Sequence, residues 1–315
     1  MQTLPSAHYF HPLGFIRSEE DTLSRALGSD LRDAAAKGHV TYRQNGNTLI
    51  CVRPLTWDSQ HFGCPMYRYE YAGLINVSSP RKPKINLTHA FTESYITLKT
   101  QHPLFYAFIE ADSRDIDLIQ AIGPTQARLV ETRLTYAYHQ PREFKLVSDK
   151  ITRMATNDDC THVAQVAASA RNPVDRVHAD PFFSLAVADE YLATYAANSV
   201  LGFADMVLVP ADSQRPVDAF MALKSHVAPP GTSLKSWGQI TLAAVAPTRR
   251  GWHRHLMIAA THWFGAHDAD MVVMTTQASN GAVIANCEKL GYRLARVSHL
   301  FAFSAGELSA TLLKK

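Results

Sequence analysis

An apolar strand that runs directly into a basic turn and an amphipathic helix is the feature that most restricts the fold of this chain. Residues 240–251 read Ile-Thr-Leu-Ala-Ala-Val-Ala-Pro-Thr-Arg-Arg-Gly, and apolar residues then recur at helical spacing over 252–267. A helix N-terminus presents unpaired N–H groups and the positive end of the helix dipole, to which Arg249, Arg250 and Arg254 add charge. The segment predicts an anion site, and a solvated basic loop is the alternative that these residues leave open.

A second unit of the same kind follows and closes the chain. Apolar residues 271–276 predict a strand, Gln277 to Asn280 form a polar connection, and residues 282–290 repeat with helical spacing. Residues 293–303 alternate as a final strand. This succession of strands and helices is typical of mixed α/β folds.

The polar stretch 138–143 is the clearest break in the chain, and it predicts a boundary between domains 1–143 and 144–315. Before it, the patterns predict helices at 18–37, 88–101 and 114–122 and strands at 48–54, 67–74, 104–110 and 129–138. After it come predicted strands at 150–155, 206–210, 217–225 and 237–245 and helices at 157–170 and 175–199, the last interrupted at Pro181. Residues 57–62 read as a loop between strands. Both halves are therefore expected to mix helices and strands, which gives the α/β (α+β) class.

Composition excludes several classes of protein. The 315 residues include 31 basic and 28 acidic ones, and a formal charge of +3 is too small to predict a nucleic-acid or membrane surface. No apolar run reaches the roughly 18 residues of a membrane helix, and residues 1–12 lack the pattern of a leader, so we expect a cytoplasmic protein. The four cysteines lie far apart and the 15 histidines fall singly, so we expect no metal.

Three motifs lie within the C-terminal segment: Val245-x-Pro247-x-x-Arg250-Gly251, Asn280-x-Ala282 and Cys287-Glu288-Lys289-Leu290-Gly291-Tyr292. Together they resemble the GNAT superfamily of N-acyltransferases. The resemblance implies an acetyl-CoA or other acyl-CoA co-substrate, pantetheine paired with the fourth strand where a mixed sheet splays open, and a diphosphate on the turn and helix N-terminus. The cofactor-binding residues that it implies are Leu242, Ala243, Ala244, Val245, Arg249, Arg250, Gly251, Trp252, His253, Arg254 and Asn280.

A longer series of motifs covers most of the chain: Pro54-Leu55-Thr56-Trp57-Asp58-Ser59-x-x-Phe62-Gly63, Ile109-Glu110-Ala111-x-x-x-x-x-Ile116 with Gly123, Arg176-x-x-x-Asp180-Pro181, and Thr276-Gln277-x-x-Asn280. The series is similar to the dTDP-fucosamine acetyltransferase family. That resemblance implies two tandem GNAT-like domains, an incomplete N-terminal one and a complete C-terminal one, and transfer of an acyl group, with acetyl expected, to the amine of a dTDP- or UDP-linked amino sugar for surface polysaccharide. The substrate-binding residues that follow are Trp57, Asp58, His61, Phe62, Arg176 and Asp180.

Two positions depart from the GNAT pattern. The family has a small residue where this chain has His253, which must turn away, donate to phosphate or reshape the site. The family's general acid is a tyrosine seven residues after Asn280, where this chain has Cys287, a residue that could protonate the departing thiolate or pack in the core. For the base, His178 is a candidate, with Asp180 or water as alternatives. The candidate catalytic residues are thus Cys287, Asn280 and His178.

Three functions remain open from the sequence: transfer to a sugar nucleotide, transfer to another small amine, and a CoA-binding module without turnover. The expected partners are an acyl-CoA and a nucleotide-linked amino sugar, with neither nucleic acid nor membrane. The sequence leaves open the acyl chain length, the nucleotide, and the choice between a monomer and a homodimer.

Overall fold

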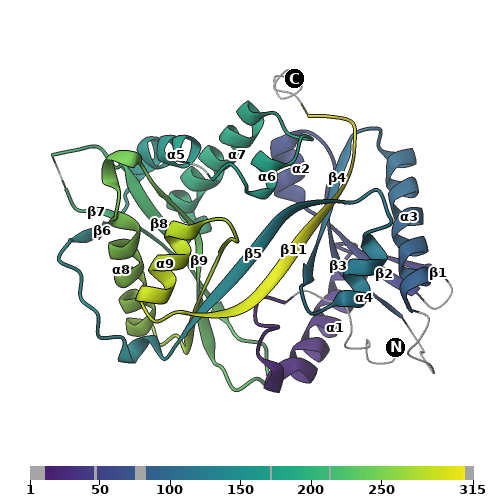
Figure 1. The fold of residues 1–315 in the computed structure, drawn as a ribbon, viewed down its shortest axis with the longest axis horizontal. Helices are drawn as coiled ribbons and strands as arrows, with labels where there is room; N and C mark the ends of the chain where they lie inside the picture. The colour runs from purple at the N-terminus through teal and green to yellow at the C-terminus, as the bar shows by residue number, and fades with distance from the viewer. Residues whose placement is uncertain (1–10, 46–47, 75–82, 171, 213, 309–315) are drawn as a thin grey trace.

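The structure of the protein is a computed structural model that describes residues 11–45, 48–74, 83–170, 172–212 and 214–308. Within these ranges the strands form an 11-stranded mixed sheet with the order β1-β2-β3-β4-β11-β5-β10-β9-β8-β7-β6 (Figure 1). Helices cover both faces of this sheet. The predicted mixture of helices and strands is therefore confirmed.

The first part of the chain contributes α1 (Glu20–Ala36), α2 (Thr56–Phe62), α3 (Pro83–Gln101), α4 (Ile116–Ile122), β1 (Thr41–Asn45), β2 (Thr48–Pro54), β3 (Met66–Leu74), β4 (Phe105–Asp112) and β5 (Arg128–His139). The remainder contributes α5 (Cys160–Ser169), α6 (Arg176–Ala179), α7 (Leu185–Asn198), α8 (Trp252–Ala266), α9 (Gly281–Lys289), β6 (Thr152–Met154), β7 (Met206–Pro210), β8 (Ala219–Val227), β9 (Ser236–Val245), β10 (Met271–Gln277) and β11 (Arg293–Ala305).

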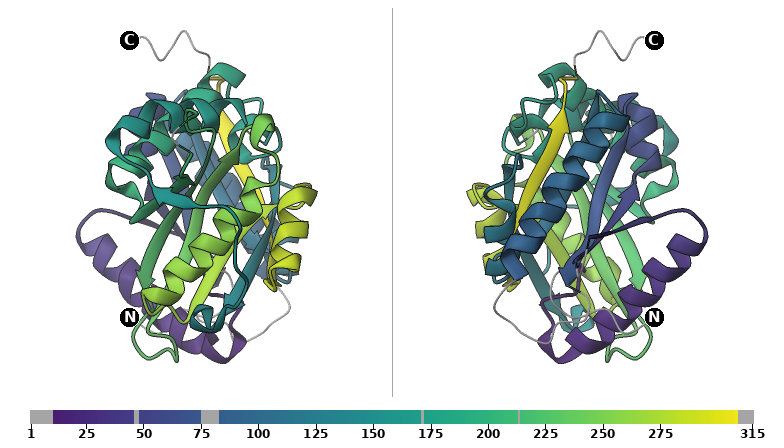
Figure 2. Two further views of the ribbon diagram at one scale, coloured as in Figure 1. Left: turned by 90° about the vertical axis from the view of Figure 1, so that its left-hand side faces the viewer. Right: turned by 90° about the vertical axis from the view of Figure 1, so that its right-hand side faces the viewer.

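Successive side chains along each strand point to opposite faces of the sheet, and a layer of helices covers each face. On β4, Phe105 and Ile109 pack against α3 and α4, whereas Tyr106 packs with residues of α2, α6 and α7 on the opposite face. On β8, Met221 packs against α8 and Phe220 against α5 in the same alternating manner. Figure 2 shows the resulting arrangement, with α3, α4, α8 and α9 on one side of the sheet and α1, α2 and α5 to α7 on the other.

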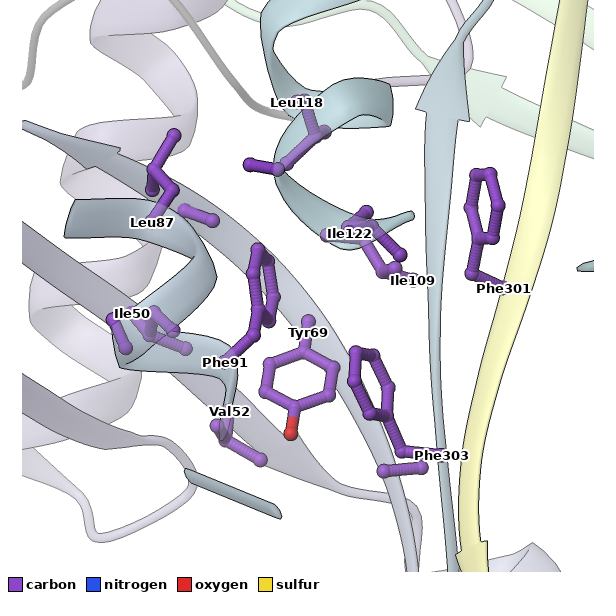
Figure 3. Close-up of a cluster of buried hydrophobic side chains, with 14 of the residues drawn as sticks. Ile50, Val52, Tyr69, Leu87, Phe91, Ile109, Leu118, Ile122, Phe301 and Phe303 are labelled. Atoms are coloured by element: carbon purple, nitrogen blue, oxygen red, sulfur yellow. The ribbon is translucent and has the colours of Figure 1, made fainter. Parts of the chain in front are cut away.

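The core under α3 and α4 draws on both ends of the chain (Figure 3). Leu87 and Phe91 of α3 and Leu118 of α4 pack with Phe301 and Phe303 of the last strand, β11. The rings of Phe91 and Phe303 stack with their centroids 5.7 Å apart. Burial of each such side chain stabilises the fold by about 1.5 to 3 kcal/mol, so β11 is firmly attached to the first part of the chain.

The two parts of the chain exchange strands at the centre of the sheet. The last strand, β11, pairs antiparallel with β4 and with β5, and β5 pairs antiparallel with β10. Each part therefore contributes a strand that lies among the strands of the other. The domain boundary between residues 143 and 144 stays a prediction, and the sheet is continuous across it.

Residues 57–62 form a helix, so the predicted loop is wrong. The helix α2 ends at Gly63, whose backbone adopts the left-handed conformation with φ of +63°, which glycine accepts readily. Trp57 and His61, one helical turn apart, stack with their ring centroids 5.4 Å apart. The strand β1 is an element that the sequence analysis did not predict, whereas the break at Pro181 between α6 and α7 is confirmed.

The neighbouring strands β9 and β10 separate along their length. They pair in parallel from Trp237 with Met271 to Ile240 with Met274, and no pairing between them continues in the described residues beyond these positions. Both strands run on, β9 to Val245 and β10 to Gln277. The sheet therefore opens as a wedge between them.

Candidate active site

A cavity of about 520 Å³, here called the donor cavity, occupies the wedge between β9 and β10. The predicted cofactor residues on its wall are Leu242, Ala243, Ala244, Val245, His253 and Asn280. On β9, peptide groups beyond Ile240 that face β10 have no partner on that strand and are open to a ligand with amide groups. Asn280 also caps α9, because its side chain accepts from the backbone N–H of Val283 at 3.4 Å.

The N-terminus of α8 adjoins the donor cavity, because His253 in its first turn lines the wall. Gly251 precedes this helix with φ of +97°, a conformation that favours glycine. Arg249 is occupied elsewhere, since its guanidinium bonds Asp218 at 2.6 Å and Asp212 at 2.9 Å.

The other predicted cationic residues of this turn, Arg250 and Arg254, are exposed, and neither lines the donor cavity. Trp252 lies outside the cavity wall as well, with Arg249 5.5 Å from its ring. The positive group of this turn that adjoins the cavity is therefore the N-terminus of α8.

His253 turns one ring nitrogen toward α9 and leaves the other without a partner. The side-chain amide of Asn286 donates to Nδ1 at 3.2 Å, which leaves Nε2 to carry the hydrogen. Nε2 is buried and bonds no group in the described residues. Burial lowers the pKa of His253 to about 4. The ring is therefore neutral at neutral pH and offers one unused N–H donor in the cavity wall.

A second cavity of about 680 Å³, here called the acceptor cavity, lies on the α1 and α2 side of the sheet. The residues that line both cavities are Glu131, Arg133, Arg176, Tyr191, Tyr195, Thr241, Thr275, Thr276 and Gln277. The two cavities thus adjoin along one wall, and a group held in one can reach a group held in the other.

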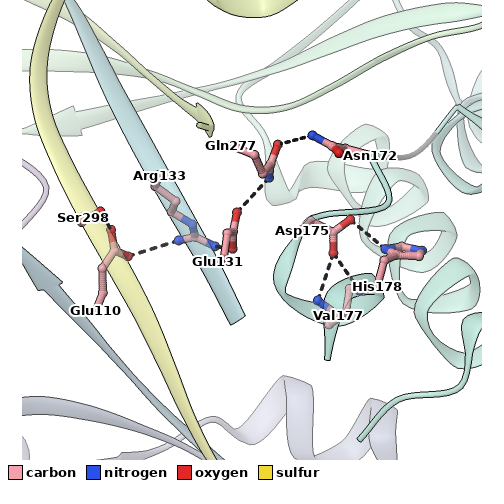
Figure 4. Close-up of polar contacts among 9 residues, drawn as sticks. All are labelled: Glu110, Glu131, Arg133, Asn172, Asp175, Val177, His178, Gln277 and Ser298. Carbon is pink, nitrogen blue, oxygen red and sulfur yellow. Dashed lines mark hydrogen bonds and ion pairs between the residues drawn. The ribbon is translucent and has the colours of Figure 1, made fainter. Parts of the chain in front are cut away.

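Glu131 lies in this shared wall within a chain of polar contacts (Figure 4). One carboxylate oxygen accepts from Arg133 Nη2 at 2.7 Å, and the other accepts from Gln277 Nε2 at 2.8 Å. Gln277 in turn accepts from Asn172 at 2.9 Å, and Arg133 also donates to Glu110 at 3.1 Å. Burial lowers the pKa of Arg133, but the two carboxylates outweigh this and raise it. The network fixes a buried carboxylate of the first part of the chain beside the wedge of the second.

Cys287 and His178 do not reach either cavity. Cys287 is 0% exposed within the core under α8 and α9, and burial raises the pKa of its thiol to about 12. The ring of His178 contacts Asp175 at 2.7 Å through Nδ1 (Figure 4). Its Nε2 contacts Asp189 at 3.1 Å. Burial lowers the pKa of His178, but these carboxylates raise it above its usual value. The two carboxylates stabilise the protonated ring, so His178 tends to carry its proton already, and both nitrogens are engaged away from the cavities.

Two of the predicted substrate residues, Asp58 and Arg176, line the acceptor cavity. Asp180 does not line it, because its carboxylate pairs with Arg128 at 2.8 Å and accepts from the hydroxyl of Tyr106 at 3.1 Å. This carboxylate supports the wall rather than facing the cavity.

Trp57, His61 and Phe62 form an aromatic group behind the acceptor cavity and line neither cavity. His61 and Phe62 both pack on Tyr191, which is part of the shared wall. Phe62 is 1% exposed. These residues hold Tyr191 in place.

The wall also contains residues that the sequence analysis did not select, chiefly Glu131, Arg133 and Asn286. Glu131 and Arg133 lie two residues apart on one face of β5, and the single carboxylate of this strand is the signal that could have drawn attention to them. Asn286 carried no such signal.

Across the described ranges, no group of three or more histidine, cysteine and acidic side chains is arranged to hold a metal ion. The helices of these ranges also include none with the length and apolar character needed to cross a bilayer.

Comparison with known proteins finds a similar fold in solved structures of low sequence identity. No protein-family profile matches the sequence. No curated protein sequence matches it either. A GCN5-related N-acetyltransferase from Sphaerobacter thermophilus is similar in structure, with a TM-score of 0.54 and 12% identity over 97% of this chain and 99% of that one.

Two further solved structures are similar over comparable lengths. A GCN5-related N-acetyltransferase from Kribbella flavida has a TM-score of 0.52 at 11% identity, covering 89% of this chain and 96% of that one. A tandem GNAT protein from the clavulanic acid biosynthesis pathway has a TM-score of 0.51 at 12% identity, covering 90% and 96%. These likenesses show the fold, and the predicted tandem GNAT architecture with a splayed mixed sheet is confirmed.

Proposed function

We propose that the protein is an acyl-CoA-dependent N-acyltransferase. The observation that supports this most strongly is the wedge between β9 and β10, which leads from the N-terminus of α8 to a wall shared with a second, polar cavity. Transfer between two bound molecules requires this kind of adjoining pair of sites, because holding the reactants in contact lowers the barrier.

In this proposal the donor cavity holds acetyl-CoA or another acyl-CoA. The open peptide groups of Leu242 to Val245 bind the amides of pantetheine, and the diphosphate lies at the N-terminus of α8 near exposed Arg250 and Arg254. The unused Nε2–H of His253 donates to an oxygen of the donor. Arg249 contributes indirectly, because its bonds to two carboxylates fix the turn.

The chemical step is direct attack of an amine on the thioester. The nitrogen lone pair forms a C–N bond to the carbonyl carbon, and the C–S bond breaks when the intermediate collapses. Glu131 accepts the proton that the nitrogen loses, and the CoA thiolate takes a proton from water. Neither Cys287 nor His178 is needed for this route.

For the acceptor we propose the amine of a dTDP- or UDP-linked amino sugar. The acceptor cavity, of about 680 Å³, has room for such a ligand, and its wall combines charged side chains with Tyr191 and Tyr195. Aromatic and polar groups together suit a sugar and a base. The motif resemblance to sugar-nucleotide acetyltransferases supports the same choice.

A thiol-release assay with acetyl-CoA tests this function. The acceptors are dTDP- and UDP-linked 3- and 4-amino-dideoxy sugars, with hydroxyl analogues that lack the amine as controls. We expect CoA release with at least one amino sugar and none with its hydroxyl analogue. Silence across the panel, with acetyl-CoA still bound, would contradict the sugar acceptor and favour another amine or a module without turnover.

A further inference from the structure

Arg176 is a buried cation in the shared wall that forms no ion pair among the described residues. It is the first residue of α6, its side chain lines both cavities, and the residue is 9% exposed. Its Nη1 atom is buried and bonds no group in the structure. In the portion of the chain that the structure describes, no carboxylate lies within ion-pair distance of its guanidinium. Buried charges in proteins are normally paired, so this one requires an explanation.

The other arginines around the acceptor cavity are bonded to groups of the protein. Arg53 and Arg68 both bond Glu70 at 2.6 Å, and Arg133 bonds Glu110 and Glu131. Arg296 donates to the backbone carbonyl of His11 at 2.6 Å. Arg176 is thus the guanidinium in this wall whose charge the described protein leaves unmatched.

The position of Arg176 is fixed by aromatic rings rather than by carboxylates. Its guanidinium carbon lies 4.5 Å from the ring centroid of Phe108 and 5.6 Å from that of Tyr106. Tyr106 is itself held, since its hydroxyl donates to Asp180, which pairs with Arg128. Rings hold a cation by its face and leave the N–H groups at its edge free to bind a ligand.

We propose that Arg176 binds an oxyanion of the acceptor molecule, a carboxylate or a phosphate, beside the amine that is acylated. Phe108, on which the guanidinium stacks, lines the acceptor cavity and not the donor cavity, which assigns the anion to the acceptor. Arg176 and Glu131 lie in the same shared wall, so the oxyanion and the amine belong to one compact part of the molecule. This inference rests on the proposed acyl transfer and names the chemical class of its acceptor.

A binding measurement tests the anion site without any turnover. Thermal unfolding is followed with and without inorganic phosphate or succinate, at matched ionic strength with chloride. We expect the wild-type midpoint to rise by about 2 °C or more, because a ligand that binds only the folded state stabilises it. The Arg176→Gln variant should not respond, and Arg176→Lys should respond in part. Arg153→Gln, whose arginine is paired with Asp159 and lines neither cavity, should respond as wild type does. An equal response in Arg176→Gln would overturn the proposal.

Kinetics with matched acceptors distinguish the sources of the anion. The pairs are an amino sugar as its anomeric phosphate and as its methyl glycoside, and an amino acid and its carboxamide. We expect wild type to prefer an anionic member by about 100-fold in kcat/KM, and Arg176→Gln to reduce this preference below about threefold. Succinyl-CoA, whose acyl group carries a carboxylate, and butyryl-CoA, whose acyl group does not, test the alternative that the anion belongs to the acyl donor. If Arg176→Gln changed the preference between these donors and not between acceptors, the assignment to the acceptor would be wrong.

The two measurements separate this inference from the proposed function. Protection of the wild type by phosphate or succinate that is lost in Arg176→Gln would support the anion site even if no amine were acylated. Acyl transfer to neutral and anionic amines at equal rates in wild type would support the transferase and overturn the anion site.

Discussion

Glu131 is the side chain on which the proposed transfer depends most. Its two oxygens accept from Arg133 and Gln277 at 2.7 and 2.8 Å, so the carboxylate is held rigidly in the wall between the two cavities. An amine becomes far more acidic as it bonds to the carbonyl carbon, so a carboxylate that is held beside it can take its proton. The surrounding residues supply this position.

Glu131→Gln should lower kcat/KM by about 10² to 10⁴, because the isosteric amide keeps the shape but cannot accept the proton. The binding constant for acetyl-CoA should stay unchanged. Glu110→Gln is the matched control, since Glu110 bonds the same Arg133. This variant should lower kcat/KM by less than about tenfold. Equal losses in the two variants would show that the carboxylates serve only to hold Arg133.

His253 makes the stability of the protein depend on pH. Its pKa is lowered to about 4 by burial in the folded state, whereas a histidine in the unfolded chain has a pKa of about 6.5. Between these values the unfolded chain binds the proton more strongly, so the free energy of unfolding falls as the pH falls. His11, whose pKa burial also lowers to about 4, acts in the same direction.

The loss of stability between pH 7 and pH 4.5 should be smaller by about 2 kcal/mol in His253→Gln than in wild type, as measured by urea unfolding. Thr100→Gln is the control, because that side chain is exposed and does not titrate, so the pH dependence should stay as it is. The same pH dependence in wild type and His253→Gln would contradict the burial of a neutral ring.

At the scale of the elements, the placement of α8 against β9 brings the N-terminus of this helix to the donor cavity. Gly238 of β9 faces the ring of Phe264 on α8 so closely that a methyl group at this position would overlap the ring. The helix can therefore lie flat on the strand only because glycine stands there. This contact is one reason why the N-terminus of α8 reaches the wedge.

Gly238→Ala should lower the free energy of unfolding by about 1 to 3 kcal/mol, because the ring or the helix must move. Gly281→Ala is the matched control: a methyl group there meets nothing within 4 Å, so stability should hold or rise by up to about 1 kcal/mol. Urea unfolding of both variants provides the measurement. Wild-type stability in Gly238→Ala would show that α8 packs less closely than described.

Local sequence patterns predicted the elements around the donor cavity. Contacts between residues that lie far apart in the sequence determine the rest of the site, and these could not be predicted. The succession β9, α8, β10 and α9 was readable because each element shows its own apolar period and its own turn. The partners of Arg249 were not readable, because Asp212 and Asp218 lie before β8, far along the chain. The helix α2 was missed because its short polar and aromatic sequence has no apolar period.

At the scale of the whole molecule, the strand exchange assembles the site from both parts of the chain. Because β5 lies between β11 and β10, Glu131 and Arg133 of the first part face the wedge of the second. The patterns of β5 and β11 are both those of central strands and do not encode which neighbour each takes, so the sequence predicted two halves without their interlocking. The carboxylate beside the wedge could for that reason be found only in three dimensions.

The most direct test of this account is a calorimetric titration with acetyl-CoA of wild type, Ala282→Trp and Ala285→Trp. Both alanines are exposed on α9, but only Ala282 lines the donor cavity, so a bulky ring there should block it without unfolding the helix. We expect wild type and Ala285→Trp to bind one acetyl-CoA per chain with a Kd between about 1 μM and 1 mM, and Ala282→Trp to bind at least about tenfold more weakly. Absence of binding to wild type, or equal binding to both variants, would contradict the assignment of the wedge as an acyl-CoA site.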